Sequence, residues 1–114
     1  MIAKKYRLIE KDFRKVLSKR KPFFSYGIVA NIAENTLDHA RVGILLSGKH
    51  APGSVNRNAW KRLIYDLCLP YLESMSLDVI FAPKKWPPLD YKNEEMRKKV
   101  SEDILFLWKT LTKK

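Results

Sequence analysis

Residues 54–67 read SVNRNAWKRLIYDL, and their spacing predicts an amphipathic helix. At about 100° per residue, one half of this helix is apolar and faces a core; it carries Val55, Ala59, Trp60, Leu63, Ile64 and Leu67. The other half forms a cationic face suited to phosphate groups, made of Arg57, Asn58, Lys61 and Arg62. Ser54 is the predicted N-cap, and the helix is expected to reach about residue 74 with a bend or break before Pro70.

The sequence before this helix predicts a short helix and two strands. The short helix covers residues 10 to about 19, with an apolar stripe of Phe13, Val16 and Leu17, and it stops before Pro22. The first strand covers residues 24–32 and alternates with a period of two, which predicts one shared face for Phe24, Tyr26, Ile28, Ala30 and Ile32. The second strand covers residues 40–46.

The sequence after the central helix predicts one strand and one helix. The strand covers residues 77–82 and is almost wholly apolar, which is typical of a strand buried on both faces. A stiff turn at residues 86–88 leads to a last helix over residues 93–111. This order of elements predicts an α+β fold, a two-layer sandwich of helices on a small mixed β-sheet. No repeat or linker divides the chain, so residues 1–114 are expected to form one domain.

The chain is strongly basic for its size. It has 114 residues, with 23 Lys and Arg against 12 Asp and Glu, and a formal net charge of +11. Nine of the cations lie between Lys4 and Lys21, where the only acids are Glu10 and Asp12. Such a charge on a small domain favours a polyanionic partner, and a basic helix favours nucleic acid over a membrane. The alternative is a basic surface that only keeps the chain in solution.

Residues that could carry chemistry are few and scattered. Cys68 is the only cysteine, which excludes an intrachain disulfide and a cysteine-rich zinc site. His39 and His50 lack companions for a metal site, and the acids do not converge, so no catalytic and no metal-binding residue is predicted. The N-terminal residues lack an apolar signal core, and no apolar run is long enough to cross a bilayer. We therefore expect a soluble, cytoplasmic protein without a membrane partner or a small-molecule substrate.

Several short motifs occur in one order along the chain and carry a family resemblance. They are Arg41-Val42-Gly43-Ile44, Ser47-Gly48-Lys49, the pairs Arg57-Asn58 and Lys61-Arg62, and Asp78-Val79-Ile80-Phe81-Ala82-Pro83. In this order they resemble the protein subunit of bacterial ribonuclease P (RNase P), over nearly the whole chain. The chain departs from the family's pattern at Gly48, Ala59 and Tyr65.

The resemblance implies both a fold and a function. The fold would be ribosomal protein S5 domain 2-like, with a left-handed βαβ crossover that runs against the usual right-handed rule. Proteins of this family bind the catalytic RNase P RNA and the 5′ leader of precursor tRNA. They assist endonucleolytic removal of the leader, and the RNA uses Mg²⁺ for the chemistry. The chain would thus be a single RNA-binding domain that serves as an accessory subunit of an endoribonuclease.

The resemblance also implies two binding surfaces. The expected contacts to RNase P RNA are Lys49, Arg57, Asn58, Lys61 and Arg62. The expected contacts to the leader are Phe13, Leu17, Tyr26 and Ile28, of which Phe13 matches an aromatic position of the family's leader cleft. The alternative function is a stand-alone RNA-binding or ribosome-associated module of the same fold, because a fold alone does not fix a function.

Overall fold

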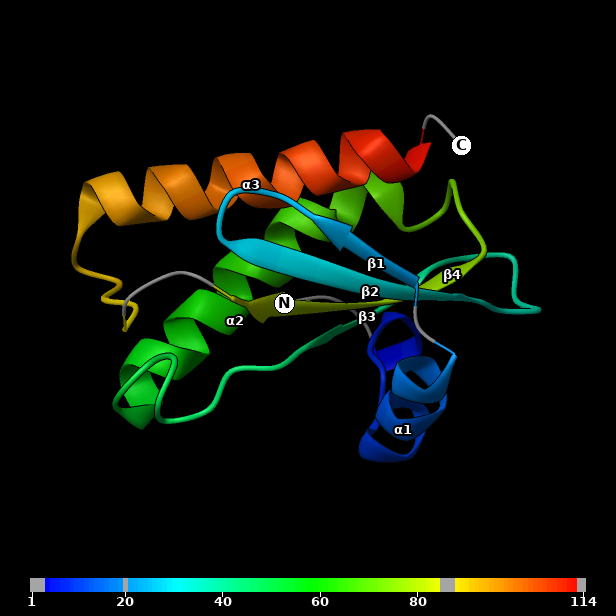
Figure 1. The fold of residues 1–114 in the computed structure, drawn as a ribbon, viewed down its shortest axis with the longest axis horizontal. Coiled ribbons are helices and arrows are strands. Elements are labelled where there is room, and N and C mark those ends of the chain that lie inside the picture. The colour runs from blue at the N-terminus through cyan, green and yellow to red at the C-terminus, as the bar shows by residue number, and fades with distance from the viewer. Residues whose placement is uncertain (1–3, 20, 85–87, 113–114) are drawn as a thin grey trace.

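A computed structural model of the chain describes residues 4–19, 21–84 and 88–112 (Figure 1). The elements in chain order are η1 (Lys4–Tyr6), α1 (Glu10–Ser18), β1 (Lys21–Phe24), β2 (Ile28–Glu34), β3 (Arg41–Ile44), α2 (Ser54–Cys68), η2 (Leu69–Tyr71), β4 (Leu77–Pro83) and α3 (Glu94–Thr112). The η elements are single turns of 3₁₀-helix. Of the stiff turn predicted at residues 86–88, the first two residues lie outside the described ranges.

The strands form one four-stranded mixed sheet in the order β1-β2-β4-β3. β2 pairs antiparallel with both β1 and β4, whereas β3 and β4 are parallel. Parallel neighbours need a crossover connection, and α2 supplies it, so β3, α2 and β4 form the expected βαβ unit. β4 lies between β2 and β3, so these two strands do not pair with each other although they are consecutive in the chain. The left-handed sense of the crossover stays a prediction.

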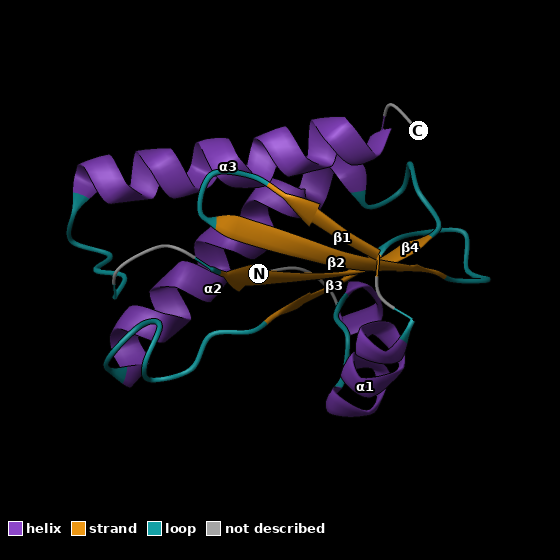
Figure 2. Cartoon of the chain, in the orientation of Figure 1, coloured by secondary structure: helices purple, strands orange, loops and turns teal. Residues whose placement is uncertain are grey.

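Helices cover both faces of the sheet (Figures 1 and 2). α2 and α3 pack on one face, over a core that includes Trp60, Phe81 and Trp108. This helix layer and the sheet confirm the predicted α+β sandwich. The short α1 lies on the opposite face, where Val16 joins Leu8 and Ile80 in a second, smaller cluster of buried side chains. We call this second side of the sheet the α1 face.

The single strand predicted over residues 24–32 is wrong, because the chain turns back between β1 and β2. The backbone N–H of Ser25 donates to the carbonyl of Ile28 at 2.9 Å, which closes the turn. The buried carboxylate of Asp103 on α3 accepts hydrogen bonds from Ser25 Oγ at 2.7 Å and from the backbone N–H of Gly27 at 3.2 Å. A contact across the molecule thus fixes the turn. In the resulting register Phe24 pairs with Val29.

The central helix has the predicted type but different ends. Gly53, with φ of 85°, is the N-cap, and Ser54 is the first helical residue rather than the cap. α2 ends at Cys68, and the next turn, which contains Pro70, is 3₁₀, so the predicted break before the proline is confirmed. Val55 was expected in the core but is 83% exposed, because the first turn of α2 extends past the sheet (Figure 1).

Candidate nucleic-acid interface

The predicted cationic half of the central helix faces away from the core. Asn58 and Arg62 are exposed, and Arg57 and Lys61 are half-buried. The opposite side of α2 contributes Trp60, Ile64 and Cys68 to the buried core. We call the set Arg57, Asn58, Lys61 and Arg62 the α2 basic face. These residues are gathered on one surface, as the helical spacing predicted.

The loop that carries Lys49 lies against the start of this surface. Nη1 of Arg57 donates to the backbone carbonyl of Ala51 at 3.3 Å, which ties the helix to the loop. Within the loop, the hydroxyl oxygen of Ser47 accepts a hydrogen bond from the backbone N–H of Lys49 at 3.2 Å. The side chain of Lys49 is exposed. The structure therefore brings Lys49 to the same side of the molecule as the α2 basic face.

Arg7 extends the cationic surface toward the other face of the sheet. The backbone of residues 7 and 8 runs along the outer edge of β3, where the N–H of Leu8 donates to the carbonyl of Val42 at 2.9 Å. Burial raises the pKa of the Tyr65 phenol on α2, and the nearby charge of Arg7 opposes that rise. Arg7 thus lies between α2 and the α1 face. Nothing in the sequence indicates that Arg7 lies here, because its position depends on backbone pairing with β3.

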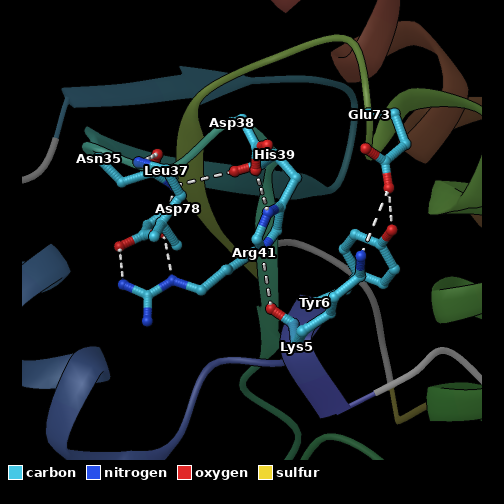
Figure 3. Close-up of polar contacts among 9 residues, drawn as sticks. All are labelled: Lys5, Tyr6, Asn35, Leu37, Asp38, His39, Arg41, Glu73 and Asp78. Atoms are coloured by element: carbon cyan, nitrogen blue, oxygen red, sulfur yellow. Dashed lines mark hydrogen bonds and ion pairs between the residues drawn. The ribbon is translucent and has the colours of Figure 1, made fainter.

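A polar network fixes the segment that carries Arg7 (Figure 3). The hydroxyl of Tyr6 hydrogen-bonds the carboxylate of Glu73, and the ring of Tyr6 meets His39 edge-on. His39 contacts the carboxylate of Asp38 through Nδ1 at 3.0 Å and the carbonyl of Lys5 through Nε2 at 3.1 Å. Both partners can only accept, so both contacts are hydrogen bonds when His39 is doubly protonated. The hydrogen bond from His39 lowers the pKa of Asp38.

The first helix presents an apolar stripe to the sheet and cations to the outside. Phe13 and Leu17 are half-buried and pack against the small cluster of the α1 face. The exposed basic residues of this segment are Lys11, Arg14, Lys15 and Lys19. Phe13 and Leu17, the two predicted leader residues of α1, are therefore only partly accessible to a ligand. The exposed cations of the same helix lie close to them.

The two other predicted leader residues do not lie beside Phe13. Ile28 is 3% exposed and belongs to the main core under α2 and α3. Tyr26 is 78% exposed in the β1–β2 turn, where it borders a hollow with Glu102 and Phe106 of α3. Their expected position on a common face with Phe13 was wrong, because that expectation depended on one continuous strand.

Phe24 is the exposed aromatic residue that the sequence reasoning missed on the α1 face. Strand alternation places Phe23 on the core side with Ala30, and Phe24 on the other side with Val29. Phe24 is 62% exposed there. A turn placed at Ser25–Gly27 would have revealed this from the sequence, since it reverses the face on which Phe24 lies.

No candidate metal centre emerges from the described ranges. Among residues 4–19, 21–84 and 88–112, no three His, Cys, Asp or Glu side chains gather as a metal site would require. Burial raises the pKa of the Cys68 thiol to about 12, and Nε1 of Trp108 donates to its sulfur at 3.2 Å. Cys68 is therefore unreactive core. The same part of the chain contains no helix with the length and apolarity that a bilayer crossing demands.

Comparisons with known proteins agree on one family and one fold. The family model described as Ribonuclease P matches residues 2–111. The solved RNase P protein from Thermotoga maritima is 22% identical, with a TM-score of 0.76 over 91% of this chain and 96% of that chain. The RNase P protein from Staphylococcus aureus is 24% identical, with a TM-score of 0.67 over 96% of this chain and 93% of that chain. No curated protein matches the chain.

The two kinds of comparison carry different weight. At these identities, the likeness to the solved structures shows a common fold, which agrees with the mixed sheet and the placement of its helices. The family model shows to which family the chain belongs, because it spans almost the entire sequence, including the Arg-Val-Gly strand and the α2 basic face. The chain therefore belongs to the ribonuclease P family.

Proposed function

We propose that this chain is the protein subunit of RNase P and that it assists removal of the 5′ leader from precursor tRNA. The observation that carries the proposal is the arrangement of basic surfaces around one sheet in a chain of this family. The α2 basic face with Lys49 binds RNase P RNA, and the α1 face binds the leader. The whole chain acts as one RNA-binding domain, in the cytoplasm.

The protein's contribution is electrostatic and geometric. Lys and Arg side chains on α2 neutralise phosphates and release counterions, which lets two polyanionic RNAs approach each other. On the α1 face, Phe13, Leu17 and Phe24 offer apolar and aromatic surface to leader bases, and α1 adds exposed cations to the same side of the sheet. The phosphodiester bond is cleaved by the RNA, which uses Mg²⁺. The stand-alone RNA-binding module is not favoured, because the RNase P family model spans nearly the entire chain.

The α2 basic face is tested by removing two of its charges. The double substitution Arg57→Ala with Lys61→Ala should weaken binding of RNase P RNA. It should also lower the slope of log affinity against log salt by about two, because each phosphate contact contributes about one to that slope. The measurement is a filter-binding titration at several salt concentrations. Lys98→Ala with Lys109→Ala is the matched control, since it removes two exposed cations of α3. Equal slopes for the two double variants would refute the assignment.

The leader surface is tested with two exposed aromatic residues on opposite sides of the sheet. Phe24→Ala should weaken holoenzyme binding of precursor tRNA by about 1–3 kcal/mol, the usual contribution of one base stacked on an aromatic side chain. Tyr26→Ala should leave it unchanged, because Tyr26 lies beside α3. Neither change removes a buried side chain, so thermal melts should be similar. Mature tRNA, which has no leader, is the second control. A larger loss for Tyr26→Ala than for Phe24→Ala would reverse the assignment of faces.

A further inference from the structure

Arg41 joins three elements of the fold through one guanidinium group. Its Nε and Nη2 atoms donate to the two carboxylate oxygens of Asp78 on β4, at 2.9 and 2.7 Å (Figure 3). Its Nη1 atom donates to Oδ2 of Asp12 on α1 at 3.2 Å. Asn35 also donates to Asp78, at 2.8 Å. The two hydrogen bonds to Asp78 therefore orient the guanidinium of Arg41 toward Asp12 on α1.

Gly43 makes the second contact between β3 and α1. It lies two residues after Arg41, so it faces the same side of the strand. A Cβ atom at this position would lie 2.4 Å from Cζ and 2.5 Å from Cε1 of Phe13. The ring of Phe13 thus rests directly on the backbone of β3, in space that only a glycine leaves. Any larger residue would push the ring, or α1 with it, away from the sheet.

These two contacts differ in kind from the rest of the α1 packing. Leu8, Val16 and Ile80 hold α1 on the sheet through apolar burial, which is not directional and tolerates sliding. The bond from Arg41 to Asp12 is charge-assisted and directional, so it fixes where α1 lies along the strand. The contact of Phe13 with Gly43 fixes how close α1 lies. Two residues of β3, Arg41 and Gly43, thus set the position of α1 along the strand and its distance from the sheet.

We propose that Arg41 and Gly43 are positioning residues that set where α1 lies on the sheet, and that they thereby shape the surface of the α1 face on which the single-stranded leader lies. The inference rests on the proposed leader surface. It gives a physical role to the first and third residues of the Arg41-Val42-Gly43 motif, neither of which is assigned to RNA contact. Arg41 is committed to two carboxylates, and Gly43 has no side chain.

The test is a double-mutant cycle between Gly43 and Phe13 in the holoenzyme. Gly43→Ala should reduce the preference for precursor over mature tRNA by about tenfold, within the range for one lost base contact. Its affinity for RNase P RNA should not change, because α2 packs on the other face of the sheet. In a Phe13→Leu background, Gly43→Ala should add no further loss, since leucine lacks the ring atoms that meet the new methyl group.

Asp12→Asn provides a second variant that does not alter core packing. This substitution keeps the shape of the side chain but removes the charge that Arg41 contacts. It should lower the preference for precursor over mature tRNA, as Gly43→Ala does. Circular dichroism melts define a temperature at which every variant is folded. If Gly43→Ala does not fold, Asp12→Asn alone decides the question.

The outcomes separate this inference from the proposed function. An unchanged precursor preference in Gly43→Ala and in Asp12→Asn would overturn the positioning role. So would an equal loss from Gly43→Ala with phenylalanine and with leucine at position 13, because the ring would then not transmit the effect. A wild-type holoenzyme that binds precursor and mature tRNA equally would instead refute the leader surface itself.

Discussion

Replacing Asp78 with alanine is expected to lower the free energy of unfolding by about 3–5 kcal/mol, the usual cost of removing one partner from a buried ion pair. Asp78 is 5% exposed and accepts hydrogen bonds from both Arg41 and Asn35. The hydrogen bonds to Asp78 raise the pKa of Arg41 against the opposing effect of burial. A guanidinium is not deprotonated in proteins, so Arg41 stays charged when its partner is removed. The measurement is denaturant unfolding of the purified chain, read as a shift of the midpoint at constant slope.

Two further variants identify the cause of that loss. Asp38→Ala removes an aspartate whose side chain is almost fully exposed, and it should change stability far less. The double substitution Arg41→Met with Asp78→Leu removes both charges and should recover much of the loss, because apolar side chains of similar size often replace a buried pair well. If the double variant were less stable than Asp78→Ala, the cost would come from lost packing and not from an unpaired charge.

The sequence predicted α2 well because a helix is encoded locally. The period that puts Trp60 in the core and Arg62 in solvent depends only on residues within a few turns of each other. The error at Val55 has a tertiary cause, since a residue at core spacing is exposed when its turn extends beyond the sheet. The local pattern thus identified the buried and exposed sides of α2, but not how much of the helix packs on the sheet.

The strands show where local pattern stops being sufficient. The alternation of apolar residues continues from Phe24 to Ile32, so it concealed a turn that Asp103 stabilises from the far end of the chain. A turn of this kind moves side chains to the opposite face of the sheet. Phe24 therefore lies on the α1 face, while Ile28 lies in the main core and not on the predicted leader surface. Asp103 itself is buried, although its neighbour Glu102 on the same helix is exposed.

The pairing of Arg41 with Asp78 could not be read from the sequence for a similar reason. The two residues face each other only because β4 enters the sheet next to β3 in a parallel register. Their separation along the chain contains the whole of α2. In the sequence, Asp78 was one of several scattered acids. In the fold, it organises the strand that carries Gly43 and the helix that carries Phe13.

The chain by itself is expected to leave precursor tRNA uncut, whereas the chain mixed with RNase P RNA at low Mg²⁺ should remove the leader. Metal-dependent hydrolysis needs converging carboxylates, and acid–base cleavage needs paired groups such as histidines. Within the described ranges, no cluster of three potential metal ligands exists. The measurement is leader cleavage with protein only, RNA only and both. Cleavage by the protein alone that persists after contaminating nucleases are removed would contradict the accessory role.

The Mg²⁺ dependence of the same assay tests how the protein helps. In the proposed function, the α2 basic face and the cations of α1 screen phosphate repulsion between RNase P RNA and its substrate. High concentrations of a divalent cation also screen that repulsion. The rate advantage of the protein should therefore be largest at low Mg²⁺ and shrink as Mg²⁺ rises, with RNA alone active at the high end. Arg57→Ala with Lys61→Ala should show a reduced advantage at low Mg²⁺ that high Mg²⁺ hides. A protein advantage that stays constant across the series would show that the protein acts on the chemical step and not on charge.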